Sequence, residues 1–147
     1  VPQDWTDYNN HMNESRYLQV FCNCSDGLLR HIGADDDYVR SGFSYYTAET
    51  HIMHKKEVAA LEPIHCTVQI LSYDEKRLHV FYRLFHSRTD DLLATGEQIY
   101  LHVDANAGKA CPAPKAILAR IAAIWDRGHE SLPRPEAAGR HVGQRKG

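Results

Sequence analysis

The sequence predicts one α+β domain, built from a long amphipathic helix followed by an antiparallel β-sheet. Apolar residues recur every three or four positions between residues 17 and 32, which is the pattern of a helix with one buried face. From residue 43 onward the pattern changes to runs of β-branched and aromatic residues with alternating polarity. Short polar turns separate the last three runs, and such turns join antiparallel neighbours.

The long helix is expected to begin after Asn13 and to end at Gly33. Asparagine is a favoured N-cap residue, and Glu14 places a negative charge in the first turn, where the helix dipole favours it. Glycine is common just beyond a helix C-terminus. The apolar stripe consists of Tyr17, Val20, Phe21, Cys24, Leu28 and Ile32. We expect this stripe to be buried against the concave face of a curled sheet.

Four strands are predicted, followed by a shorter helix. The strands are expected over residues 43–53, 64–70, 78–85 and 92–103, and the helix over residues 115–125. Four strands are few for such a sheet, so we expect a further strand before Val1. We assign residues 1–127 to the folded domain. Residues 128–147 carry no apolar period and are predicted to form a mobile tail or to wrap around a partner subunit.

Composition and charge exclude several classes of function. The 147 residues are 43% hydrophobic and 24% charged, as in a globular domain, and the net charge of -2 argues against nucleic acid or an anionic membrane as a partner. No apolar stretch reaches the ~18 residues of a membrane span, and no signal-peptide pattern opens the chain. The four cysteines match neither a zinc cluster nor a disulfide framework, so we expect reduced thiols and a cytoplasmic location.

The histidines do not predict a metal site. His51 and His54 are three residues apart in a predicted strand, so their side chains point to opposite faces of the sheet. The same alternation separates His79 from His86. No metal is therefore expected.

The densest group of functional side chains lies in the loop just before the long helix, between residues 4 and 13. Asp7 could act there as a general base or a nucleophile, and His11 and Asn13 could orient a water or polarise a carbonyl. The free N–H groups of a helix N-terminus offer donors to a carbonyl oxygen. The alternative is a structural loop, since Asp and Asn side chains commonly bond to backbone groups before helices.

This loop resembles a family signature. Residues 7–13 read Asp-Tyr-Asn-Asn-His-Met-Asn and are followed by Arg16 and Tyr17, which is similar to the Asp-x-x-Gly-His-x-Asn pattern of the 4-hydroxybenzoyl-CoA thioesterase-like hot-dog family. The resemblance covers most of residues 1–125. The family's glycine falls at Asn10, and asparagine is the residue that best tolerates the positive φ that glycine often supplies.

A narrower resemblance concerns the acyl group. The wider form of the motif, which begins at Trp5, together with residues 49–52 and 101–104, is similar to the betainyl-CoA thioesterases of carnitine breakdown, which are sometimes fused to a carnitine dehydrogenase. The resemblance implies a hot-dog fold, in which an antiparallel sheet wraps a long central helix. It also implies hydrolysis of a small acyl-CoA thioester, such as betainyl-CoA, to the free acid and CoA.

The resemblance further implies roles for individual residues. Asp7 would attack the thioester carbonyl or activate a water, backbone N–H groups between Asn10 and Asn13 would receive the oxyanion, and His11 would orient the site or contact the substrate. Glu49 lies in a strand rich in aromatic residues and suggests a pocket that faces a cation or water. The structural alternative for Glu49 is an exposed strand position.

A trimethylammonium acyl group would need aromatic walls, because it donates no hydrogen bonds but is attracted to π faces. The candidate walls are Trp5, Tyr8, Phe43, Tyr45 and Tyr46. The residues predicted to bind the substrate are Trp5, Tyr8, Asn10, Tyr45 and Glu49. By resemblance to the family, we expect a homodimer or homotetramer with CoA along the subunit interface, and no metal or organic cofactor.

Two other functions compete with hydrolysis. Hot-dog acyl-CoA hydratases and dehydratases resemble an Asp-x-Asn-x-x-His pattern, whereas Asp7, Asn9 and His11 are one residue short of it. A non-catalytic acyl-CoA binding or assembly module would be favoured by loss of the carboxylate, and Asp7 is present. An α/β-hydrolase is excluded, because the chain has no Gly-x-Ser-x-Gly motif.

Overall fold

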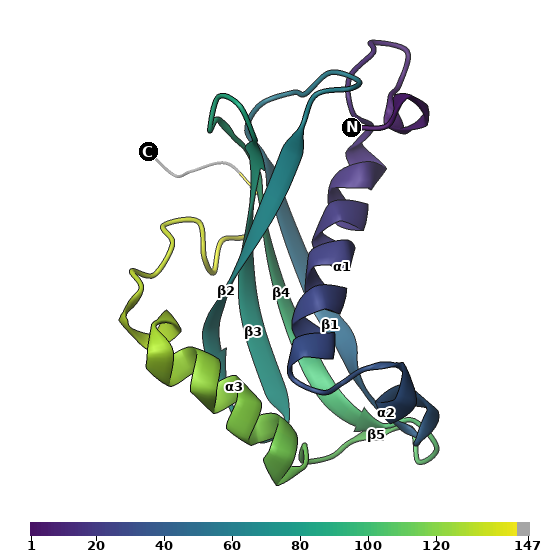
Figure 1. Cartoon of the computed structure of the whole chain (residues 1–147), viewed down its shortest axis with the longest axis vertical. Coiled ribbons are helices and arrows are strands. Elements are labelled where there is room, and N and C mark those ends of the chain that lie inside the picture. The colour runs from purple at the N-terminus through teal and green to yellow at the C-terminus, as the bar shows by residue number, and fades with distance from the viewer. Residues whose placement is uncertain (144–147) are drawn as a thin grey trace.

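The computed structural model describes residues 1–143 and shows one antiparallel sheet with a long helix against one face (Figure 1). The strands are β1 (Phe43–His54), β2 (Ile64–Tyr73), β3 (Arg77–His86), β4 (Leu92–Asp104) and β5 (Lys109–Ala110). The sheet order is β1-β4-β3-β2, and the short β5 pairs with β4. The helices are α1 (Glu14–His31), α2 (Asp36–Arg40) and α3 (Lys115–Arg127), with 3₁₀ turns at Gln3–Trp5 and His129–Ser131. The predicted α+β class is confirmed.

α1 occupies the segment that the apolar stripe predicts. Asn13 is its N-cap, and the Asn13 side chain accepts a hydrogen bond from the Ser15 N–H at 3.0 Å. Glu14 lies in the first turn, where its charge complements the helix dipole. Gly33 follows the last turn with φ of +96°, a conformation that glycine adopts without strain.

The centre of the core is the contact between α1 and the middle of the sheet. Phe21 of α1 is fully buried and stacks on Tyr82 of β3, with ring centroids 5.4 Å apart. Gly96 of β4 lies beside the same ring, and a Cβ atom at this position would come within 2.8 Å of it. A glycine is therefore needed here because α1 approaches the sheet so closely.

The sequence pattern does not predict two short elements, α2 and β5. An acidic run, which in sequence alone is typical of a loop, begins α2: Asp35 caps the helix by accepting a hydrogen bond from the Tyr38 N–H at 3.0 Å, and Asp36 and Asp37 lie in its first turn. β5 has only two residues, which is too short for an alternating pattern, and pairs with the end of β4.

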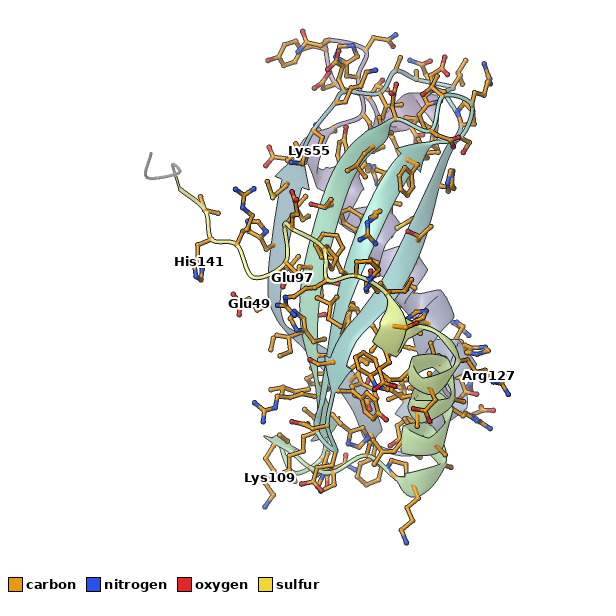
Figure 2. All side chains as sticks on the ribbon, turned by 90° about the vertical axis from the view of Figure 1, so that its left-hand side faces the viewer. Glu49, Lys55, Glu97, Lys109, Arg127 and His141 are labelled. Carbon is orange, nitrogen blue, oxygen red and sulfur yellow. The ribbon has the colours of Figure 1, made fainter. Side chains whose placement is uncertain are left out.

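The segment after α3 lies on the face of the sheet opposite α1 (Figure 2). His129 Nδ1 accepts a hydrogen bond from the Ile70 N–H at 2.9 Å and so covers part of the β2 edge. Farther along, the Gly139 N–H donates to the buried Glu97 carboxylate at 2.7 Å. The mobility of residues 128–147 stays a prediction, and residues 144–147 lie outside the described part of the chain.

Two further expectations concern membranes and metals. No helix within residues 1–143 is long and apolar enough to cross a membrane. Within the same residues, no three His, Cys, Asp or Glu side chains are grouped so that they could hold a metal ion. The strand expected before Val1 stays a prediction; the Val1 carbonyl accepts a hydrogen bond from the Leu61 N–H at 2.7 Å, close to the start of β2.

Candidate active site

The loop before α1 is a tight turn held by its own backbone. The Asp7 N–H donates to the His11 carbonyl at 2.9 Å, and the Asn10 N–H donates to the Asp7 carbonyl at 3.0 Å. Asn10 has φ of +59°, in the left-handed region. Asparagine is among the few non-glycine residues that adopt this conformation readily, so Asn10 can stand where the motif that this turn resembles has glycine.

The turn is attached to the segment between β1 and β2. The Met12 N–H donates to the Val58 carbonyl at 2.8 Å, and His11 forms an isolated bridge with Ala59. Met12 itself is buried in the core. These contacts fix the turn relative to the residues that follow β1, although the two segments are far apart in the sequence.

The Asp7 side chain is half-buried, and only one of its two carboxylate oxygens accepts a hydrogen bond within residues 1–143. One of its oxygens, Oδ1, accepts a hydrogen bond from the Asn9 N–H at 2.8 Å. This bond orients the carboxylate, while Oδ2 makes no hydrogen bond within residues 1–143. A carboxylate held in this way is suited to attack a carbonyl carbon or to accept a proton from water.

Asp7 lines a cleft of about 420 Å³ between the turn, the start of α1 and the end of β1. The cleft is lined by Asp7, His11, Met12, Glu14, Tyr17, His54, Lys55, Lys56 and Glu57. Lys55 marks its position near the end of β1 in Figure 2. Three carboxylates and two lysines therefore face one open space, which is large enough to admit a small acyl group.

Tyr17 forms the floor of this cleft. The residue is only 4% exposed, and its ring meets the His54 imidazole edge-on, with centroids 4.7 Å apart. Its hydroxyl makes no hydrogen bond to another residue within 1–143. Burial, together with the negative charge of Glu57, raises the pKa of Tyr17. The hydroxyl therefore stays protonated and can donate a hydrogen bond to an oxygen in the cleft.

Comparison with known proteins identifies the family. The family model described as the thioesterase-like superfamily matches residues 1–121. The chain belongs to the thioesterase-like superfamily. The betainyl-CoA thioesterase of Pseudomonas aeruginosa is 36% identical over 144 residues, covering 97% of this chain and 90% of that protein. A putative thioesterase of Pseudomonas putida has a similar structure, with a TM-score of 0.82 and 30% identity over 99% of this chain and 93% of the other.

Other relatives of this thioesterase-like chain are longer or more distant. The L-carnitine dehydrogenase/betainyl-CoA thioesterase of a Rhizobium species is 54% identical over 146 residues, which cover 99% of this chain but 29% of the relative. The chain thus spans less than a third of the length of that relative. A Staphylococcus aureus protein solved with CoA has a TM-score of 0.90 at 22% identity, covering 99% of this chain and 91% of the other, and shows the fold alone.

Five of the predicted residues of this thioesterase-like chain lie in the turn or beside it, and Asn10 is the one with positive φ described above. Asp7 and His11 line the cleft, and the side chain of Asn13 is engaged in capping α1. Tyr8, at the tip of the turn, is 97% exposed. Roles for these residues in catalysis or binding stay predictions.

Trp5 faces a different groove. The Arg16 guanidinium lies over its ring, 5.3 Å from the centroid. The indole lines a groove between α1 and β2 together with Val20 and Cys24, and it is absent from the lining of the Asp7 cleft. Because a cation already covers its face, Trp5 is poorly placed within one chain to contact a trimethylammonium group in that cleft.

Tyr45 and Glu49 lie farther away along β1. Tyr45 pairs with His102 near one end of the strand, whereas His54 is at the other end, about 30 Å away at ~3.3 Å per residue. Burial raises the pKa of Tyr45, and its hydroxyl has no partner within residues 1–143. Within one chain the structure therefore does not bring Tyr45 to Asp7.

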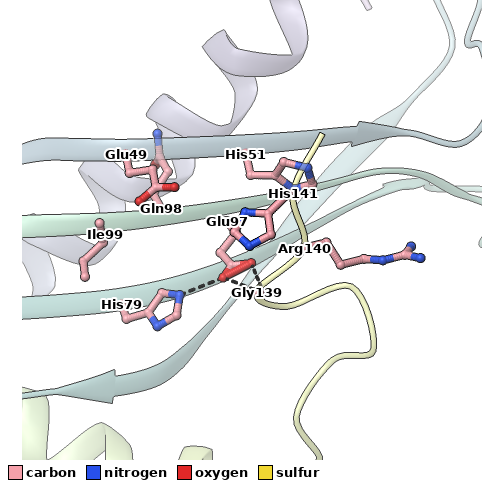
Figure 3. A pocket seen from close by; sticks show the side chains of 9 residues that line it. All are labelled: Glu49, His51, His79, Glu97, Gln98, Ile99, Gly139, Arg140 and His141. Carbon is pink, nitrogen blue, oxygen red and sulfur yellow. Dashed lines mark hydrogen bonds and ion pairs between the residues drawn. The ribbon is translucent and has the colours of Figure 1, made fainter. Parts of the chain in front are cut away.

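Glu49 belongs to a second pocket, on the outer face of the sheet, with a volume of about 250 Å³ (Figure 3). Its central group is Glu97, which accepts hydrogen bonds from His79 Nε2 at 2.8 Å and from the Gly139 N–H at 2.7 Å. Through these bonds the Glu97 carboxylate holds the segment around Gly139 on the sheet. The Asp7 cleft has an open carboxylate instead, and we therefore take it as the candidate active site.

Sequence reasoning missed four charged or titratable residues of the cleft: His54, Lys55, Lys56 and Glu57. They are adjacent in sequence to the end of a predicted strand, where functional side chains often gather. Nothing in their spacing links them to Asp7, because the link is the hydrogen bond between Met12 and Val58.

Proposed function

We propose that this chain hydrolyses a small acyl-CoA thioester, with betainyl-CoA as the preferred substrate. The observation that carries the proposal is the Asp7 carboxylate, oriented by the Asn9 N–H and open to a cleft at the start of α1. The name of the P. aeruginosa relative, which matches nearly the whole chain, supports betainyl-CoA as the substrate. The name of the longer Rhizobium relative also includes betainyl-CoA thioesterase.

Two routes for Asp7 are chemically complete. In the first, a carboxylate oxygen bonds to the thioester carbonyl carbon, the C–S bond breaks, and CoA leaves as a thiolate that takes a proton from water. A second water then hydrolyses the acyl anhydride and restores Asp7. In the second, Asp7 accepts a proton from the water that attacks the carbonyl, and the departing thiolate takes up that proton.

Both routes place negative charge on the carbonyl oxygen, which needs hydrogen-bond donors. We propose that the backbone N–H of His11 supplies one of them, because the N–H groups of Asn10, Met12 and Asn13 already donate to backbone carbonyls and are not free as the sequence motif led us to expect. The Tyr17 hydroxyl is a further donor, because burial keeps it protonated. His11, which lines the same cleft as Asp7, would orient the acyl group.

We further propose that two copies pair through β1. This strand is at the edge of the sheet, and within residues 1–143 it pairs only with β4. A long unpaired edge favours pairing with another strand. Antiparallel pairing through β1 would bring the Tyr45 end of this strand in one copy to the His54 end in the other copy, beside the Asp7 cleft. A single-chain mass in sedimentation equilibrium would contradict this pairing.

The proposed location is the cytoplasm. Cys22, Cys24, Cys66 and Cys111 are all free thiols. Cysteines that stay reduced are typical of that compartment.

The experiment that tests the function measures CoA release with a thiol-reactive dye. The substrates are betainyl-, acetyl-, butyryl-, 4-hydroxybenzoyl- and palmitoyl-CoA, and hydration of crotonyl-CoA is followed in parallel by the loss of its enoyl absorbance. Preferential hydrolysis of betainyl-CoA is expected. Hydration without CoA release would instead indicate a hydratase, and no reaction with any ester would indicate a binding or assembly module.

A further inference from the structure

We propose that Glu57 selects a positively charged acyl group in the Asp7 cleft. This inference rests on the proposed hydrolase function and assigns part of its substrate specificity to one side chain. Glu57 would act through its charge on the quaternary ammonium of the substrate, while Asp7 acts on the carbonyl carbon. The two carboxylates would thus have separate tasks in one cleft.

The backbone position of Glu57 is fixed relative to the turn that contains Asp7. Glu57 directly precedes Val58, whose carbonyl accepts the Met12 N–H at 2.8 Å, and both Glu57 and Asp7 line the same cleft. The betainyl nitrogen is separated from the carbonyl carbon by one CH₂ group, a distance of about 2.5 Å. An acyl group whose carbonyl lies at Asp7 therefore keeps its ammonium inside this cleft.

Glu57 is a carboxylate of the cleft that forms no ion pair within the described residues, so its charge is available to a ligand. Its neighbour Lys56 is bound to Asp91 at 2.6 Å, whereas Glu57 forms no ion pair with any residue in the described range 1–143. Lys55, which also lines the cleft, carries a positive charge that suits the phosphates of CoA. Glu14 is on the α1 side and interacts there with the helix dipole.

Tyr17 provides a second, independent indication that the floor of the cleft receives a ligand. The Tyr17 side chain lines the cleft and is only 4% exposed. Its hydroxyl makes no hydrogen bond to another residue within 1–143. The field of Glu57 reaches this hydroxyl, because the carboxylate contributes to the raised pKa of Tyr17. A cation between them would be held by charge and by the aromatic ring, and neither contact requires an N–H donor.

The test compares two esters that differ in charge and hardly in shape. Betainyl-CoA carries a trimethylammonium group, and 3,3-dimethylbutanoyl-CoA carries a neutral carbon in place of the nitrogen. Glu57→Gln is expected to lower kcat/KM for betainyl-CoA about tenfold, mainly through KM, and to leave the neutral ester within about twofold. The matched control is Glu75→Gln, an exposed glutamate in the β2–β3 turn, which should change neither ester.

The outcomes separate this inference from the proposed function. An equal loss for both esters, or no change in their ratio, would overturn the role of Glu57 while leaving the hydrolase intact. A loss of the ratio in Glu14→Gln but not in Glu57→Gln would also overturn it. If the wild-type chain hydrolyses neither ester, the proposed function itself is wrong.

Discussion

Asparagine in place of Asp7 is expected to lower kcat/KM for betainyl-CoA by about 100-fold or more. The amide has the size of the carboxylate, and its oxygen can still accept the Asn9 N–H that orients the side chain. It has no negative charge with which to attack a carbonyl or to remove a proton from water. The loss should therefore lie in kcat, and the thiol-release assay measures it directly.

A neighbouring carboxylate provides the control for this substitution. Asp4 is exposed, lies in the 3₁₀ turn at Gln3–Trp5 and is absent from the lining of the cleft. Asp4→Asn should retain activity within about twofold, since surface changes of this kind have small effects. If Asp7→Asn keeps more than a tenth of the wild-type rate while its melting temperature is unchanged, Asp7 is not the reactive group.

Truncation of Phe21 is expected to cause the largest loss of stability, about 3–5 kcal/mol in the free energy of unfolding. The side chain is fully buried, stacks on Tyr82 and covers Gly96, so its removal leaves a cavity at the centre of the core. Urea denaturation of Phe21→Ala measures this loss. Leu18→Ala, on the same helix at a side chain that is 41% exposed, should cost less than about 1 kcal/mol.

The double variant tests the explanation for Gly96. Alone, Gly96→Ala should cost about 1–3 kcal/mol, because its methyl group would lie 2.8 Å from the Phe21 ring. In the Phe21→Ala background the ring is absent, so the same methyl group should cost much less or fill part of the cavity. Additive losses in the double variant would contradict a direct contact between the two residues.

Much of the fold could be predicted from the sequence because its elements are long and strongly periodic. The stripe from Tyr17 to Ile32 predicts α1, and alternating residues predict the four long strands. α2 and β5 are too short to show a period. The acidic run at Asp35–Asp37 is equally consistent with a loop and with the capped start of a helix, and only the hydrogen bond from the Tyr38 N–H to the Asp35 carboxylate distinguishes the two.

The candidate site could be predicted only where it is continuous in the sequence. The turn that contains Asp7 is a single segment, so its motif is visible. Lys55 and Glu57 join it through a tertiary hydrogen bond that no spacing reveals. Tyr45 has a suitable side chain but lies at the far end of β1, and only a second copy of the chain could bring it to the cleft.

The central claim is that the acyl group binds in the Asp7 cleft. Its most direct test is a crystal structure with the ketone analogue of betainyl-CoA, in which CH₂ replaces the thioester sulfur and hydrolysis is blocked. We expect the carbonyl carbon within about 3.5 Å of an Asp7 carboxylate oxygen, with the trimethylammonium group directed toward Glu57. An analogue whose acyl group lies in the outer pocket beside Glu97, or anywhere outside the Asp7 cleft, would contradict the claim.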